Sequence, residues 1–121
     1  MNSVYGLTNK KCVPCRSGVT PLVRKEALFL LKYLKGWTLS PGAKAIRAEY
    51  LMKDFMAAVQ FINRLAKLAE AENHHPDIHL SGYRRLIVEI STHAIHGLSE
   101  NDFILAAKIG VLPKSLKESK K

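Results

Sequence analysis

The sequence contains few residues from which a metal centre or a disulfide framework could be built. Only two of the 121 residues are cysteine, Cys12 and Cys15, in a single Cys-x-x-Cys motif with Pro14 between them. A structural zinc site needs four ligands, and a redox pair more typically follows a strand and opens a helix. We therefore interpret the motif as a turn that carries two thiols, with metal binding and redox chemistry as the alternatives.

Long hydrophobic runs are also missing. No apolar stretch approaches the ~20 residues of a transmembrane helix, and Met1 to Lys11 lacks the hydrophobic segment of a secretory signal. We expect a cytoplasmic protein without membrane contacts. With 47% hydrophobic and 24% charged residues, the composition is that of an ordinary soluble protein, and this length suits one compact domain.

Acidic residues are scarce, with 10 Asp and Glu against 19 Lys and Arg, which gives a formal net charge of +9. Such a charge is typical of nucleic-acid binding, but much of the excess lies near the two ends, at Lys10, Lys11, Arg16, Lys114, Lys117, Lys120 and Lys121. Basic patches interleaved with aromatic residues, as in single-strand binders, are not evident. The sequence does not favour a nucleic acid as partner, although the positive field could steer an anionic one.

Hydrophobic periodicity predicts seven elements. Helical spacing marks residues 22–35, 55–72 and a last helix from Ser99 to about Gly110; Thr20 and Pro21 predict the start of the first helix, and Asp54 that of the second. Two hairpins are predicted from residues 37–39 with 45–52, and 78–80 with 83–92.

This order predicts an α+β fold, with a four-stranded antiparallel sheet and three helices packed on one face. We expect an irregular N-terminal segment over residues 1–20, a single domain over 21–113 and a basic C-terminal tail over 114–121.

Three histidines lie at the ends of predicted elements. His74 and His75 come directly before Pro76, which holds the pair at the boundary of the long helix. His93 leaves the last predicted strand. Imidazole can give or take a proton near neutral pH, so a fold that gathers the three predicts an acid–base site. The other two histidines, His79 and His96, we assign to the surface.

Two carboxylates extend this cluster. Glu70 precedes His74 by one helical turn, and Asp102 is the third residue after the Ser99 cap of the last helix. A carboxylate beside an imidazole orients the ring and favours its charged form. The plainer interpretations are a solvated helix residue for Glu70 and a helix-start residue for Asp102. There is no nucleophile elbow or Gly-rich phosphate loop, so the pattern indicates proton transfer without a covalent intermediate.

Zinc is the competing hypothesis for the three histidines, because three of them can hold a catalytic zinc ion. Neighbouring side chains in an extended segment point to opposite sides, which would strain a tripod built from His74, His75 and His93. We therefore expect no metal.

The same residues resemble a known family. Glu70-x-x-x-His74-His75-Pro76, then Ser91-Thr92-His93, then the segment from Gly97 to Asp102 and the helix after it, is similar to the pterin-4a-carbinolamine dehydratases. The N-terminal Cys-x-x-Cys segment and Gly36-Trp37 resemble the bacterial-type members. Two positions depart from the common pattern, Ile78 where many members carry an aromatic residue and Gly110 where an acidic one is common.

The resemblance implies a lyase, 4a-hydroxytetrahydrobiopterin dehydratase, acting in tetrahydropterin recycling. Such an enzyme removes water from a 4a-hydroxy-tetrahydropterin, the product of aromatic amino-acid hydroxylases, and leaves a quinonoid dihydropterin. His74 and His93 would be the acid–base residues and His75 would position the pterin. Glu70 and Asp102 would hold charge and orientation, and the backbone near Ser91 and Thr92 would bond the ring edge.

The resemblance also implies no metal and no organic cofactor, a homodimer or homotetramer, and a hydroxylase in the same pathway. The alternative is a non-catalytic binding module. Relatives of this fold act as dimerisation cofactors of transcription regulators, and a pterin- or molybdopterin-related binding role is a further hypothesis.

Overall fold

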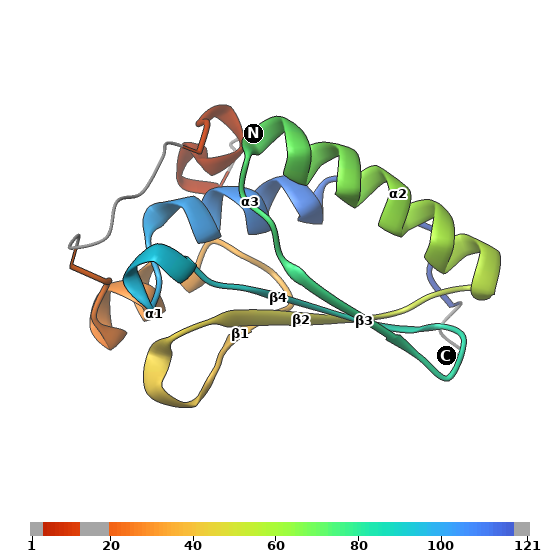
Figure 1. Ribbon diagram of the computed structural model, residues 1–121, viewed down its shortest axis with the longest axis horizontal. Helices are drawn as coiled ribbons and strands as arrows, with labels where there is room; N and C mark the ends of the chain where they lie inside the picture. The colour runs from red at the N-terminus through yellow and green to blue at the C-terminus, as the bar shows by residue number, and fades with distance from the viewer. Residues whose placement is uncertain (1–3, 13–19, 118–121) are drawn as a thin grey trace.

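The computed structural model describes residues 4–12 and 20–117 (Figure 1). Its elements are η1 (Val4–Asn9), α1 (Arg24–Leu31), β1 (Trp37–Leu39), η2 (Pro41–Ala43), β2 (Ile46–Leu51), α2 (Phe55–Glu72), β3 (Asp77–Ser81), β4 (Arg85–Ile90), η3 (His93–Ile95) and α3 (Glu100–Gly110). The elements labelled η are short 3₁₀ helices. The predicted order of three α-helices and four strands is confirmed.

The four strands form one antiparallel sheet in the order β1-β2-β4-β3. β1 with β2 and β3 with β4 are the two predicted hairpins, and β2 and β4 pair in the centre with Ile46 opposite Ile90. α2 and α3 lie above the sheet in Figure 1, and α1 lies at its left end. The predicted α+β class, with a four-stranded antiparallel sheet and helices on one face, is confirmed.

Alternation along the strands explains which face of the sheet is covered. In β2, Ile46 and Ala48 are buried while Arg47 and Glu49 are exposed, and β4 repeats the pattern with Leu86, Val88 and Ile90 buried. Side chains of a strand point alternately to the two faces, so the buried set faces the helices. α3 is buried along nearly its whole length, as expected from its run of five consecutive apolar residues, 103–107.

Local capping signals set the ends of α2. The Asp54 carboxylate accepts a hydrogen bond from the Ala57 N–H at 2.8 Å, which satisfies one of the free donors at a helix start. The helix ends at Asn73, which adopts the left-handed conformation with φ 53° and ψ 41°. Both ends agree with the prediction.

The start of α1 differs from the prediction. The helix begins at Arg24 rather than at Pro21, with Val23 at the N-cap. The Leu22 N–H donates to the Leu98 carbonyl at 2.8 Å, and Pro21 packs so closely on Gly97 that a Cβ there would lie 2.7 Å from the proline ring. These tertiary contacts hold residues 20–23 extended.

The segments predicted to flank the domain contact it. Residues 4–9 form η1 instead of the predicted irregular structure, and Leu7 is completely buried. In the predicted basic tail, the Ser115 carbonyl accepts a hydrogen bond from the Lys53 N–H, and the Lys117 N–H donates to the carbonyl of Leu51, the last residue of β2. The domain boundaries proposed at residues 20 and 113 stay a prediction. No helix in residues 4–12 and 20–117 is long and apolar enough to cross a membrane.

Candidate active site

The candidate site lies where the end of α2, the end of β4 and the start of α3 meet. β3 and β4 pair in antiparallel register with Asp77 opposite Glu89. The residues just before β3 therefore lie at the same end of the sheet as those just after β4. This topology brings His74 and His75 to the end at which Thr92 leaves β4.

Asp102 is the centre of a hydrogen-bonded cluster and is completely buried. Its Oδ1 lies 2.7 Å from Nε2 of His74. Its Oδ2 accepts one hydrogen bond from the Thr92 hydroxyl and one from the Ser99 backbone N–H, both at 2.8 Å. An ionised carboxylate only accepts hydrogen bonds, and the place of Asp102 in the first turn of α3 favours the carboxylate form through the helix dipole.

This bonding determines which nitrogen of His74 carries a proton. With Asp102 as a carboxylate, Oδ1 accepts and Nε2 of His74 donates, so that the neutral ring has its lone pair on Nδ1. The side chain of His74 is 12% exposed, so the ring is held largely within the protein. An imidazole oriented in this way can accept a proton at Nδ1 and return it as an imidazolium stabilised by Asp102.

Thr92 supports the carboxylate from the other side. The residue is buried, and its hydroxyl, which donates to Asp102, lies 2.8 Å from Oγ of Ser99. Its backbone N–H bonds to the Gly97 carbonyl at 2.8 Å and closes the loop that contains η3. Ser91 is half-buried next to it.

His75 and Glu70 form a second, separate pair. Nε2 of His75 lies 2.8 Å from Oε2 of Glu70, and the two side chains are 55% and 78% exposed. Glu70 thus contacts His75, whereas its spacing had related it to His74. Adjacent histidines point to opposite sides, with the half-buried His74 against Asp102 and His75 at the surface.

His93 is exposed at the start of η3, directly after the buried Thr92. In the described part of the chain, no hydrogen bond or ion pair involves its side chain. The hydrogen bonds therefore unite His74, Thr92 and Asp102, whereas His93 adjoins them only through the backbone. His79 and His96, assigned to the surface, are both exposed.

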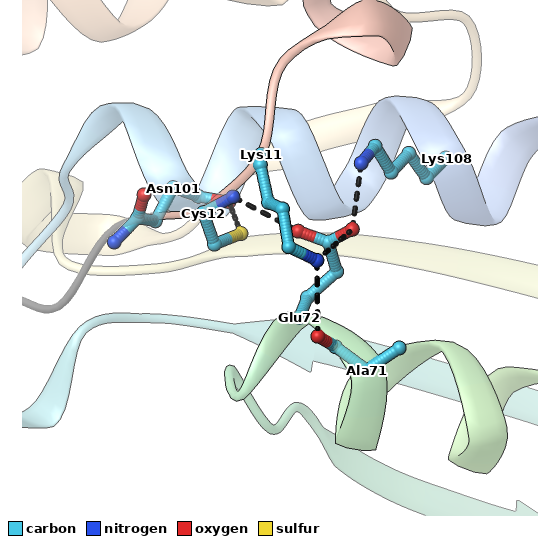
Figure 2. A network of polar contacts seen from close by, with 6 residues as sticks. All are labelled: Lys11, Cys12, Ala71, Glu72, Asn101 and Lys108. Carbon is cyan, nitrogen blue, oxygen red and sulfur yellow. Dashed lines mark hydrogen bonds and ion pairs between the residues drawn. The ribbon is translucent and has the colours of Figure 1, made fainter.

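Sequence reasoning missed a polar network beside this site (Figure 2). The Glu72 carboxylate, at the end of α2, is buried. It accepts a hydrogen bond from the Cys12 N–H at 2.9 Å and pairs with Nζ of Lys108 on α3 at 2.6 Å. A signal was present, because Glu72 continues the spacing of the buried residues Leu65 and Ala69 and so falls on the apolar face of α2.

Charge and burial shift two pKa values in this network. Burial alone would raise the pKa of Glu72, but the hydrogen bonds from Lys108 and Cys12 and the charges of Lys108 and Lys11 lower it below its ordinary value. Burial, followed by the charge of Glu72 and a hydrogen bond to it, raises the pKa of the Cys12 thiol to about 12. The turn predicted for the Cys-x-x-Cys motif lies outside the described residues.

A metal ion would need at least three ligating side chains close together. Among the described residues, no three or more His, Cys, Asp and Glu side chains are grouped to hold a metal ion.

The fold and the site define an α+β protein in which a half-buried histidine meets a buried carboxylate. The family model described as pterin 4 alpha carbinolamine dehydratase matches residues 20–112, and the chain belongs to this family. The resemblance seen in the sequence is confirmed.

Relatives match over most of the chain. A Halorhodospira halophila protein, provisionally named a pterin-4-alpha-carbinolamine dehydratase, is 48% identical over 106 residues, which are 88% of this chain and 96% of the relative. The mitochondrial pterin-4-alpha-carbinolamine dehydratase 2 of Arabidopsis thaliana is 42% identical over 113 residues, 91% of this chain and 60% of the plant protein.

A solved structure matches as well. The crystal structure of a transcriptional coactivator/pterin dehydratase from Brucella melitensis superposes with a TM-score of 0.69 at 33% identity, covering 74% of this chain and 95% of the Brucella chain.

Proposed function

We propose that this protein is a pterin-4a-carbinolamine dehydratase, which removes water from a 4a-hydroxy-tetrahydropterin and releases a quinonoid dihydropterin. The observation that carries the proposal is the buried Asp102 that holds His74 through one ring nitrogen, in a chain that belongs to this family. The physiological substrate would be 4a-hydroxytetrahydrobiopterin, formed by an aromatic amino-acid hydroxylase.

The reaction needs two proton transfers and no change of oxidation state. A base takes the proton from N5 of the pterin, the electron pair of that bond forms the N5=C4a double bond, and the C4a–O bond breaks. The departing hydroxyl takes a proton and leaves as water. Imidazoles suit both steps, because they exchange protons near neutral pH.

The roles follow from how each histidine is held. His74 exchanges its proton at Nδ1, while Asp102 stabilises the charged ring through Nε2. His93, exposed and directly after Thr92, is the second proton-transfer group. His75, oriented by Glu70, positions the pterin, and the backbone near Ser91 and Thr92 bonds the polar ring edge.

The remaining parts of the proposal concern the setting. We expect a cytoplasmic homodimer or homotetramer that acts without metal or organic cofactor.

The test follows quinonoid dihydropterin formation by absorbance, with carbinolamine supplied by a hydroxylase. The wild-type protein should accelerate dehydration above the spontaneous rate. His74→Ala and His93→Ala should each lower kcat by about 100-fold or more, as expected when an acid–base group is lost. His79→Ala, which alters an exposed residue of β3, is the matched control and should retain the wild-type rate.

The name of the Brucella structure supports testing one alternative, a transcriptional coactivator. If the folded wild-type protein leaves carbinolamine loss at the spontaneous rate, the dehydratase proposal is wrong. Binding to a transcription regulator by the same inactive protein would then favour the coactivator role.

A further inference from the structure

We propose that Glu72 is a positioning residue for the His74–Asp102 pair, and that it acts by tying an N-terminal strap, residues 4–12, to the ends of α2 and α3. This inference rests on the proposed function, since it concerns the same histidine. The strap lies outside residues 20–112 that the family model matches.

The His74–Asp102 hydrogen bond joins two different helices. His74 follows Glu72, the last residue of α2, by two positions, and Asp102 lies in the first turn of α3. The 2.7 Å separation of Nε2 and Oδ1 therefore depends on how the end of α2 is seated against α3. A small shift of either helix end would lengthen the bond that orients the imidazole.

Glu72 provides a direct tie between these helices. Its carboxylate pairs with Nζ of Lys108 on α3 at 2.6 Å, and the two side chains are only 6% and 19% exposed. Removing one partner of a buried ion pair leaves the other charge without compensation, which is costly. The Glu72–Lys108 pair is therefore costly to break, and it holds the end of α2 against α3 only two residues before His74.

The strap adds ties to both helix ends (Figure 2). The Cys12 N–H donates to Oε1 of Glu72 at 2.9 Å, and the Cys12 thiol donates to the Asn101 carbonyl at 3.5 Å. Lys11 donates to the Ala71 carbonyl at 3.2 Å. The strap thus bonds to the last turn of α2 and to Asn101, which is the residue directly before Asp102.

Two further contacts keep the strap in place. Lys10 pairs with Glu100 at the start of α3 at 2.6 Å, and Leu7 in η1 is completely buried. Glu72 makes both kinds of contact, because it accepts a hydrogen bond from the strap backbone at Cys12 and pairs with Lys108 on α3. Loss of its carboxylate should therefore loosen the strap and both helix ends together.

The experiment compares Glu72→Gln with Glu49→Gln, in steady-state kinetics and in NMR. Glu49 is the matched control, because it also forms a 2.6 Å ion pair, with Arg85, but on the exposed face of the sheet. We expect Glu72→Gln to lower kcat by about tenfold or more with KM changed less than about twofold, since misplacement of a reacting group costs rate more than binding. Glu49→Gln should match the wild-type protein.

The NMR measurement does not depend on activity. In the wild-type protein, the Nε2 proton of His74 that is bonded to Asp102 should give a slowly exchanging downfield resonance. Glu72→Gln should broaden this resonance or speed its exchange with water, because the hydrogen bond to Asp102 would be less well held. A wild-type protein without dehydratase activity would reject the proposed function, and the NMR comparison would still test the role of Glu72.

A double variant separates positioning from stability. Glu72→Met with Lys108→Met removes both charges at similar volume, a change that folded proteins often tolerate well, and it also removes the acceptor for the Cys12 N–H. We expect this variant to fold and to keep the low kcat of Glu72→Gln. The inference would be overturned if either folded variant, Glu72→Gln or the double variant, kept the wild-type kcat and an unchanged His74 resonance. The dehydratase proposal would then still stand.

Discussion

Nε2 of His74 and Oδ1 of Asp102 lie 2.7 Å apart, although the two residues are separated by 28 positions in the chain. The left-handed conformation of Asn73 ends α2 and turns the chain at the residue before His74. On the other side, Asp102 is held by the Thr92 hydroxyl and the Ser99 N–H. Three segments, the end of α2, the residue after β4 and the start of α3, thus contribute to the placement of the His74 ring.

Asp102→Asn should lower kcat by about 100-fold or more. The amide cannot accept on both sides as the carboxylate does, and it carries no charge to stabilise the imidazolium form of His74. Steady-state dehydration rates of the purified variant measure the effect, and circular dichroism checks that it is folded. A folded variant with the wild-type kcat would contradict the proposed role of Asp102.

Thr92→Val should destabilise the protein by about 1–3 kcal/mol, the usual cost of leaving buried polar partners unsatisfied. Valine has nearly the same shape but offers no hydroxyl to Asp102 or Ser99. Urea unfolding measures the change in free energy. The control is Thr38→Val on β1, because the hydrogen bond of the Thr38 hydroxyl is exposed. This variant should change the free energy of unfolding by less than half as much as Thr92→Val.

The stability of the protein should fall in acid partly because Glu72 becomes protonated. The pKa of Glu72 in the folded protein lies below its ordinary value of 4.5. Its contribution is therefore fully present above about pH 4.5 and is lost as the pH falls through the lower, folded value. Unfolding free energies of the wild-type protein and Glu72→Gln, measured between neutral pH and pH 3, should converge toward the acid end. Parallel curves would show that Glu72 titrates alike in both states.

Cys12 should react slowly with iodoacetamide at pH 8 in the folded protein. Burial, with Glu72 nearby, raises the pKa of its thiol to about 12, so the reactive thiolate is rare. Peptide mass spectrometry after timed labelling measures modification at Cys12 itself. Denaturant should restore fast labelling, and Glu72→Gln should speed it in the folded protein, because the charge of Glu72 contributes to the shift. Rapid labelling of the native wild-type protein would be inconsistent with the raised pKa of the half-buried Cys12 thiol.

The elements with agreeing local signals were predictable from the sequence. Asp54 caps the start of α2 and Asn73 its end, as their residue types favour, and Ser99 with Asp102 caps the start of α3. The start of α1 was not predictable, because a threonine–proline cap was outweighed by the bond of Leu22 to Leu98. Contacts with distant residues leave no mark in a local pattern.

The candidate site shows the same division. The sequence grouped three histidines with two carboxylates, but it did not show which carboxylate serves which ring. Helical spacing related Glu70 to His74; since the helix ends at Asn73, Glu70 instead meets His75. Glu72 was overlooked because its partners, Lys108 and Cys12, face it only in the folded chain.

The most direct test of the central claim is a crystal structure of the protein with bound 7,8-dihydrobiopterin. The proposal predicts that N5 and C4a of the ring lie within proton-transfer reach of His74 Nδ1 and the His93 side chain, with the His74–Asp102 hydrogen bond intact. A pterin bound elsewhere, or a His74 ring whose Nδ1 faces away from it, would contradict the account.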